Sequence, residues 1–379
     1  MKKKILFIFG TRPEAIKLAP VILAFKNQSE YFETRVCVTA QHREMLDQVL
    51  SFFQIVPDVD LDIMKPGQSL ADVTVTGLSQ LVETLTAFPA DLVFVQGDTT
   101  TAFIGALAAY YRKIQVAHVE AGLRSGNKYS PFPEEMNRIL AGHLSDYHFA
   151  PTDRAVENLR KENIQQRVYN VGNPVLDALL LGLDLIRRDG EEKYAAHFNM
   201  LSFEKRIVLI TGHRRESFGM PFENICEAIH ECASQFPDVQ FVYPVHLNPN
   251  VREPVMRLLS DVHNVHLMEP LDYPHFIWLM SKSYLVLTDS GGLQEEAPAL
   301  GKPVLVMRDV TERTEGIEAG TARLVGTEKE VIASALIELL SDESTYESMS
   351  KASNPYGDGK SAGRIVEVIR KHILTLSEA

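Results

Sequence analysis

Two series of short apolar runs, each followed by a segment of helix length, constrain the fold of this chain more than any other feature. Nearly continuous apolar strands of this kind are typical of a parallel sheet that helices cover on both faces. The first series predicts strands at residues 4–10, 34–40, 91–97, 115–122, 146–150 and 167–172. The second series predicts strands at residues 206–212, 239–245, 265–268, 284–290, 302–307 and 322–326. The sequence therefore predicts an α/β chain of two doubly wound domains.

The predicted domain boundary lies at Asn173-Pro174, where a turn-forming pair interrupts the chain and helix-forming residues follow. We place one Rossmann-like domain at residues 1–172 and a second at residues 173–359. Segment 360–376 has the amphipathic pattern of a helix with one apolar side.

Composition and charge exclude several classes of protein. Hydrophobic residues make up 45% and charged residues 23% of the 379 residues, which is ordinary for a globular chain. The formal net charge of -12 argues against nucleic acid or an anionic membrane as the main partner. The apolar run before Gly10 is too short for a signal peptide, and no stretch approaches the ~18 apolar residues of a membrane span. We therefore expect a soluble, cytoplasmic protein with its three cysteines buried and reduced.

Polar residues directly follow the predicted strands, at the positions where open α/β sheets bind ligands. Five such groups occur, in both halves of the chain: Gly10-Thr11-Arg12, Gln96-Gly97-Asp98, His118-Val119-Glu120, Gly212-His213-Arg214-Arg215 and Asp289-Ser290-Gly291-Gly292. One polar loop would be unremarkable, but five across both halves indicate one ligand held in a cleft between two domains.

The segment 289–301, DSGGLQEEAPALG, has the pattern of a phosphate site. We expect Ser290 to cap the next helix, while Gly291 and Gly292 leave N–H groups open at its N-terminus. Glu296, in the first turns of that helix, is suited to ribose hydroxyls. A capped helix with a tight glycine turn explains the segment equally well. No G-x-G-x-x-G motif is present here or after the first strand, so a dinucleotide site is not supported.

Charged residues at the strand exits, by which we mean the loops that directly follow the strands, suggest both anion binding and acid–base chemistry. The basic ones are Arg12, Lys17, His213, Arg214, Arg215 and Arg313. Guanidinium groups suit phosphate, although surface solubility explains any single arginine. The acidic ones are Asp98, Glu120, Glu134 and Glu135. Carboxylates beside a diphosphate favour acid–base catalysis, whereas helix capping and compensation of the helix dipole are the alternatives for Asp98 and Glu134.

Several long motifs resemble those of one known family. They are GTRPEAIKLAP (10–20), TAQHREMLDQ (39–48), GDTTT (97–101), HVEAGLRS (118–125), SPFPEEMNR (130–138), TGHRRESFG (211–219), YPVHLNP (243–249), LTDSGGLQEEAPALGKPVLVMRDVTERTEG (287–316) and NPYGDG (354–359). Over essentially its whole length the chain resembles the non-hydrolysing UDP-N-acetylglucosamine 2-epimerases of bacteria. The resemblance implies glycosyltransferase-B architecture, in which two Rossmann-like domains face a central cleft and a C-terminal helix, residues 360–379, returns to the first domain. It also implies a homodimer, no cofactor and no required metal.

The resemblance also assigns site residues, position by position. Sugar–diphosphate contacts fall on Arg12, Lys17, Asp98, Glu120 and His213. The uracil, phosphate and ribose contacts fall on Leu271, Phe276, Ser290, Gly291, Gly292, Glu296 and Arg313. The catalytic positions are Asp98, Glu120, Glu134 and His213. A second UDP-N-acetylglucosamine, acting as allosteric activator, would contact Gln41, Gln68, Glu134, Arg214 and His246.

The chain departs from the family pattern at a few positions. Gln96 stands where the family often has His, and Phe132 stands where Trp or Tyr is usual. Glu44 and Gly67 replace Gln and Arg of some members near the allosteric site, which weakens the affinity expected there. None of these positions is catalytic.

The resemblance implies a mechanism in which UDP is eliminated to give 2-acetamidoglucal and then adds back, with a proton delivered to the opposite face of C2. Which carboxylate is the base and which is the acid stays open. Three rival functions are a UDP-sugar glycosyltransferase of the same fold, a hydrolysing epimerase that releases free N-acetylmannosamine, and a nucleotide-sugar sensor without catalysis. A glycosyltransferase needs an acceptor groove, a hydrolysing epimerase often carries a kinase domain, and a sensor would lack the four catalytic residues.

Overall fold

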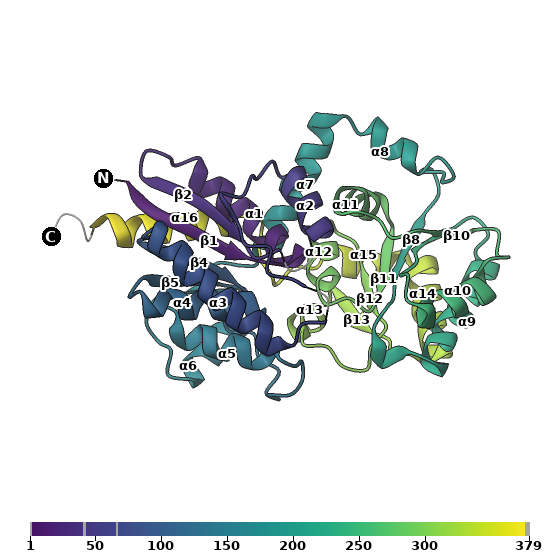
Figure 1. Ribbon diagram of the computed structural model, residues 1–379. Helices are drawn as coiled ribbons and strands as arrows, with labels where there is room; N and C mark the ends of the chain where they lie inside the picture. Colours follow the sequence, from purple (N-terminus) through teal and green to yellow (C-terminus); the bar gives the residue numbers. More distant parts are fainter. Residues whose placement is uncertain (1, 41–42, 66, 376–379) are drawn as a thin grey trace. The chain divides into compact units, whose positions relative to one another are not determined.

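The computed structural model describes residues 2–40, 43–65 and 67–375 of the chain. The protein divides into two compact units, each with its own parallel sheet (Figure 1). Unit 1 consists of Met1–Leu181 and Tyr356–Ala379, and unit 2 consists of Gly182–Pro355. The division falls inside one helix, α7 (Pro174–Asp189), whereas our predicted boundary follows Gly172.

Unit 1 is built on a seven-stranded parallel sheet with the strand order β3-β2-β1-β4-β5-β6-β7. Its strands are β1 (Lys3–Phe9), β2 (Phe32–Val38), β3 (Val59–Asp60), β4 (Leu92–Gln96), β5 (Gln115–Val119), β6 (Tyr147–Ala150) and β7 (Val168–Asn170). The six strands predicted for this half are confirmed. The sequence does not predict β3, because two residues are too few to show an apolar run.

Helices connect these strands and cover the sheet of unit 1. They are α1 (Arg12–Lys26), α2 (Arg43–Phe52), α3 (Leu70–Ala87), α4 (Thr100–Tyr111), α5 (Glu134–Leu144), α6 (Asp153–Lys161), the first part of α7, and α16 (Ser361–Thr375). The last helix, α16, packs against α1, and Nε2 of His372 lies 2.7 Å from the hydroxyl oxygen of Tyr169 (Figure 1). The predicted helix that returns to the first domain is confirmed.

Unit 2 repeats the design with a six-stranded parallel sheet in the order β10-β9-β8-β11-β12-β13. Its strands are β8 (Ile207–Thr211), β9 (Gln240–Pro244), β10 (Val265–Met268), β11 (Leu285–Thr288), β12 (Val304–Val306) and β13 (Ala322–Leu324). Its helical segments after α7 are α8 (Glu192–His197), η1 (Arg215–Ser217), α9 (Met220–Gln235), α10 (Pro249–Leu259), α11 (Tyr273–Lys282), α12 (Leu293–Ala299), α13 (Thr314–Glu318), α14 (Lys329–Ser341) and α15 (Glu343–Ser350). All six predicted strands of this half are confirmed.

Aromatic side chains fill the core of unit 1 beneath β1 and β4. The rings of Phe7 and Phe94 stack with centroids 4.6 Å apart, and Phe25 of α1 meets both edge-on. Every residue of β4 is buried, because helices cover both faces of the sheet. This burial is the physical reason for the unbroken apolar runs in the sequence, and it fixes the strand ends from which the polar loops emerge.

The order of strands reverses between β1 and β4 in unit 1 and between β8 and β11 in unit 2. In open α/β sheets, ligands bind beyond the carboxyl ends of the strands at such a reversal. The residues that follow these four strands are Gly10-Thr11, Gly97-Asp98, Gly212-His213 and Asp289-Ser290. The polar groups singled out in the sequence therefore lie at the ligand-binding edge of each sheet. Within the described part of the chain, no helix has the length and apolar character needed to cross a membrane.

Candidate active site

Glu120 directly follows β5 and is buried, with its backbone in the left-handed region at φ 63°. Nζ of Lys17 lies 2.7 Å from Oε1 and 2.6 Å from Oε2 of Glu120. Gln96 donates from Nε2 to Oε2, and Asn173 donates from Nδ2 to Oε1 over 3.1 Å. Residues other than glycine rarely adopt this backbone conformation, and the strain that it causes is concentrated at functional sites. The structure therefore brings together Lys17 and Glu120, two of the predicted site residues.

Glu14 is a buried carboxyl that our sequence prediction does not include. Its Oε2 accepts hydrogen bonds from the N–H groups of Gly10 (3.0 Å) and Thr11 (2.8 Å), and its Oε1 accepts one from the hydroxyl of Thr99 (2.7 Å). Glu14 thereby ties the loop after β1 to the loop after β4. The T-x-x-E spacing of Thr11 and Glu14 is the signature of a capping box, and it is the sequence signal that identifies this residue.

The charge of Glu14 makes the stability of the protein depend on pH. Burial raises the pKa of Glu14 above its ordinary value of 4.5, although its hydrogen bonds oppose the shift. The folded state therefore holds this proton more tightly than the unfolded state, and the carboxyl lowers stability increasingly as pH rises above 4.5. The glutamine in Glu14→Gln is neutral at every pH. As pH rises from about 5 to about 8, the free energy of unfolding of this variant should therefore fall less than that of the wild type. Urea unfolding at both pH values measures this difference, with the surface variant Glu33→Gln as control. Parallel pH curves for wild type and Glu14→Gln would refute the assignment.

Asp98, the predicted catalytic acid after β4, is about one-third exposed and forms an ion pair with Arg138 of α5. Its carbonyl oxygen accepts a hydrogen bond from Nδ2 of Asn137 over 3.0 Å. The alternative that Asp98 caps α4 is wrong, because Thr99 is the N-cap and its side chain accepts from the N–H of Ala102. The side chain of Asp98 is therefore engaged by Arg138 and not by the backbone of α4.

Glu134 and Glu135 begin α5, but they differ in environment. Glu135 is buried, and its oxygens accept hydrogen bonds of 3.0 Å from the N–H groups of Ser125 and Gly126. Its contacts show that it holds the loop before α5. Glu134 is the first residue of the helix and is partly exposed, where a carboxylate suits the positive end of the helix dipole.

Three further residues predicted for the site belong to unit 1. Arg12 is the first residue of α1 and is half-buried at the exit of β1. Gln68 belongs to the loop before α3, where it donates to the carbonyl oxygen of Ile63 (3.0 Å) and accepts from the N–H of Lys65 (2.6 Å). Gln41 lies outside the described residues.

Asp289 anchors the strand exits of unit 2, although our sequence prediction does not assign it to the site. It is buried, and its Oδ2 accepts hydrogen bonds from the N–H groups of His213 (2.6 Å) and Arg214 (2.7 Å). Nδ1 of His213 lies 3.5 Å from Oδ1 of the same carboxylate. The His213 ring stacks on that of His246, with centroids 5.4 Å apart. The exits of β8, β9 and β11 therefore meet at His213.

The glycine loop before α12 differs from our expectation in one respect. Ser290 does not cap the helix, because α12 begins at Leu293 and Gly292 is its N-cap, without a capping side chain. The N–H groups of Gly291, Gly292 and Leu293 donate to no acceptor among the described residues. Glu296 lies in the first turn of α12, as predicted.

Arg313 lies beside this loop, since a Cβ built on Gly291 would be 3.5 Å from Cζ of Arg313. Nε of Arg313 donates to Oε1 of Glu295 (2.9 Å), and Nη1 donates to Oε1 of Glu312 (2.7 Å). Burial alone would raise the pKa of Glu312, but nearby arginines, Arg313 first among them, lower it to about 2. The guanidinium is therefore held firmly by two carboxylates beside the open N–H groups.

Leu271 and Phe276 occupy the loop after β10 and the first turn of α11, and both are half-buried. His246 follows β9 and is exposed, and its Nδ1 accepts from the N–H of Asn248 over 3.1 Å. Burial and the neighbouring His213 lower the pKa of His246, so its ring is more readily neutral.

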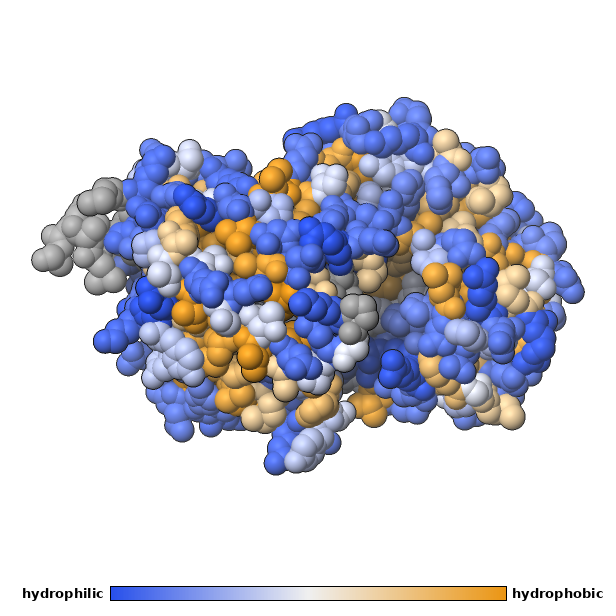
Figure 2. Space-filling model, viewed as in Figure 1, coloured by the Kyte–Doolittle hydropathy of each residue, from blue (hydrophilic) through white to orange (hydrophobic). Residues whose placement is uncertain are grey.

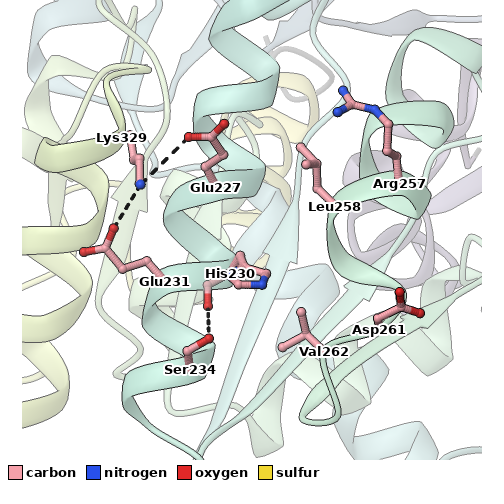
Figure 3. Close-up of a pocket in the computed structure, with 9 residues that line it drawn as sticks. All are labelled: Glu227, His230, Glu231, Ser234, Arg257, Leu258, Asp261, Val262 and Lys329. Carbon is pink, nitrogen blue, oxygen red and sulfur yellow. Dashed lines mark hydrogen bonds and ion pairs between the residues drawn. The ribbon is translucent and has the colours of Figure 1, made fainter.

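A pocket of about 640 Å³ lies elsewhere in unit 2, between α9, α10 and the start of α14 (Figure 3). Its lining residues are Glu227, His230, Glu231, Ser234, Arg257, Leu258, Asp261, Val262 and Lys329. Lys329 lies 3.8 Å from Glu227 and 3.2 Å from Glu231, so the charges of the pocket largely balance one another. No predicted site residue lines this pocket. Across residues 2–40, 43–65 and 67–375, no group of three or more His, Cys, Asp or Glu is placed to hold a metal ion.

Comparison with known proteins gives a consistent result. The family model described as UDP-N-acetylglucosamine 2-epimerase matches residues 24–370. The UDP-N-acetylglucosamine 2-epimerase of Escherichia coli K12 is 54% identical over 376 residues, which cover 98% of this chain and 100% of that protein. The crystal structure of UDP-GlcNAc 2-epimerase from Neisseria meningitidis bound to UDP-GlcNAc matches with a TM-score of 0.90 and 50% identity, covering 97% of this chain and 100% of that one. The Methanocaldococcus jannaschii enzyme in complex with UDP-GlcNAc and UDP matches with a TM-score of 0.81 and 34% identity, covering 97% and 99%.

The two doubly wound sheets and the returning helix are those of the glycosyltransferase-B architecture, and the 2-epimerases that the chain matches are isomerases. The chain belongs to the UDP-N-acetylglucosamine 2-epimerase family. The family prediction from the sequence motifs is thereby confirmed.

Proposed function

We propose that the protein interconverts UDP-N-acetylglucosamine and UDP-N-acetylmannosamine by inverting C2, and that it supplies N-acetylmannosamine-type sugars for cell-surface polysaccharide. The main support is the pair of carboxylates that follow two neighbouring strands of unit 1: Glu120 after β5, which is paired with Lys17, and Asp98 after β4. A relative of 50% identity is a UDP-GlcNAc 2-epimerase bound to UDP-GlcNAc. Burial of all three cysteines as free thiols fits the reducing cytoplasm, where we place the enzyme.

The proposed chemistry is elimination followed by re-addition. The C2–H proton passes to a carboxylate, its electron pair forms the C1=C2 double bond of 2-acetamidoglucal, and the C1–O pair leaves with UDP. The UDP oxygen then attacks C1, and a proton reaches C2 from the opposite face. Because the proton leaves one face of C2 and returns on the other, the reaction requires at least two proton-transfer groups. The candidates are Asp98, Glu120 and Glu134.

The leaving group requires stabilisation of its growing negative charge. In unit 2 we propose this role for Arg313, His213 and the open N–H groups of the Ser290-Gly291-Gly292 loop. In the same proposal, Leu271 and Phe276 contact the uracil, and Glu296 binds the ribose. In unit 1, Arg12 and Lys17 are the proposed contacts to the sugar–diphosphate.

A glycosyltransferase of the same fold is the competing function. It would share the phosphate loop of unit 2, but it has no need of a fixed carboxylate at the exit of β5. The buried Glu120, held in a rarely adopted backbone conformation by three donor side chains, favours the epimerase.

We further propose regulation and assembly. A second UDP-N-acetylglucosamine would bind Gln41, Gln68, Glu134, Arg214 and His246 and activate the enzyme. A homodimer would cover the apolar surface of unit 1, where Leu70 and Val75 of α3 and Tyr110 and Tyr111 of α4 are exposed. Figure 2 shows apolar side chains gathered over this unit. Burial of such a patch against a second copy would stabilise a dimer.

Incubation with UDP-N-acetylglucosamine in D2O tests the proposed chemistry. Because the C2 proton leaves and a solvent proton returns, UDP-N-acetylmannosamine should carry deuterium at C2, as seen by proton NMR. Product with protium fully retained at C2 would contradict elimination and favour an internal transfer. Incubation without enzyme is the control for non-enzymatic exchange.

A further inference from the structure

The acceptor positions of Glu120 are all filled. A carboxylate offers about four lone-pair positions, two on each oxygen. Lys17 occupies one position on each oxygen, Asn173 takes the second on Oε1, and Gln96 takes the second on Oε2. Glu120 is therefore arranged as a fully hydrogen-bonded anion, without a vacant position for a proton from substrate.

The orientation of the Asn173 amide follows from its other hydrogen bond. Asn173 is fully buried, and its Oδ1 accepts from the N–H of Val175 over 3.1 Å. A backbone N–H can only donate, so the oxygen must face Val175 and the NH2 group must face Glu120. The backbone N–H of Asn173 in turn donates to the carbonyl oxygen of Tyr356 over 2.7 Å. Asn173 is thus fixed on both sides before it reaches Glu120.

Gln96 reaches Glu120 from the neighbouring strand. It is the last residue of β4, is almost fully buried, and pairs in register with Val119, the residue before Glu120. Gln96 adds a donor without adding charge. A buried acceptor that loses such a donor pays the desolvation cost of the missing bond.

We infer that Gln96 and Asn173 are positioning residues, which hold Glu120 as a fixed, ionised carboxylate. This inference rests on the proposed function, in which a negative charge beside the sugar stabilises the oxocarbenium-like state. Proton transfer at C2 then falls to Asp98 and Glu134.

Titratable groups lie on the elements that surround Glu120. Lys17 on α1 is its ion-pair partner, and Asp98 follows β4. His118 on β5 is fully buried, and burial lowers its pKa to about 4, so its ring is neutral above that pH. Nε2 of His118 donates to the carbonyl oxygen of Gly97 over 2.7 Å. His118 therefore contributes no change of charge between about pH 5 and about pH 8.

The charge of Glu120 can be observed directly in protein labelled with 13C at the glutamate carboxyl carbon. Its resonance is assigned by its loss in Glu120→Gln. In the wild type the resonance should remain that of a carboxylate from about pH 8 down to about pH 5. Gln96→Met removes one donor at similar length, so protonation of Glu120 should begin at a proton concentration about tenfold lower. The matched control is Gln240→Met, which removes another buried glutamine amide, bonded to Ser202 in unit 2.

Kinetics supply the second measurement. As pH falls, the loss of turnover should begin at a proton concentration about tenfold lower in Gln96→Met than in the wild type, with KM changed less than about twofold. Gln96→His, whose ring N–H can also donate, should return the onset of this loss towards its wild-type pH. An unshifted Glu120 resonance in Gln96→Met, or an equal loss of turnover at every pH, would overturn the inference. Absence of epimerisation by the wild type would instead refute the proposed function, while the NMR titration still decides the inference.

Discussion

Asp98→Asn, Glu120→Gln and Glu134→Gln should each lower turnover at least about 10²-fold, the usual scale for groups that act in proton transfer or charge stabilisation. Each substitution keeps the shape of the side chain and removes its charge. Steady-state turnover of UDP-N-acetylglucosamine measures the effect. Binding of UDP should survive in Glu134→Gln, because we assign this residue to chemistry and its position is the first turn of α5.

Glu157→Gln is the matched control for these variants. Glu157 is exposed on α6, away from the strand exits of unit 1, so this substitution should leave turnover unchanged. A variant with all three site carboxylates replaced that retained near-normal turnover would leave only a binding role for these residues.

The reverse reaction should stall on pure UDP-N-acetylmannosamine and start when a trace of UDP-N-acetylglucosamine is added. The reason is the proposed second site, whose ligand would favour the active state through its higher affinity for that state. Forward kinetics should accordingly be sigmoidal. His246→Ala should flatten the sigmoid without abolishing turnover, because it removes the ring that stacks on His213 but not His213 itself.

The control for this effect is His230→Ala, which removes an exposed histidine of α9 that lines the separate pocket of unit 2 (Figure 3). It should leave the sigmoid intact. Hyperbolic kinetics in the wild type, together with a prompt reverse reaction on pure substrate, would show that this protein lacks the switch.

The architecture was largely predictable because the strands of both sheets are buried on both faces. That burial demands unbroken apolar runs such as LVFVQ of β4, which stand out in the sequence. The strand β3 could not be predicted, because its two residues, Val59–Asp60, pair only with the end of β2 and are too few to show an apolar run. The strand exits were predictable for the same reason, since each begins where an apolar run ends.

The supporting residues of the site were harder to predict, because their roles depend on contacts between distant segments. Glu14 accepts a hydrogen bond from Thr99, and Asp289 accepts hydrogen bonds from the N–H groups of His213 and Arg214. Asn173 reads in sequence as a turn residue before a proline, yet it is fully buried and donates to Glu120. Only the fold brings these residues beside their partners.

The path of the chain through the two units has a consequence for how the protein is made. Unit 2 is one continuous segment, Gly182–Pro355, whereas unit 1 is completed by Tyr356 and the residues that follow it. The helix α16 packs on α1, and Asp177 accepts hydrogen bonds from the N–H groups of Ser361 and Ala362. Domains generally fold as units while the ribosome is still adding residues. The segment that is synthesised first must therefore wait for the last helix, and every residue of unit 2 is synthesised before unit 1 is complete.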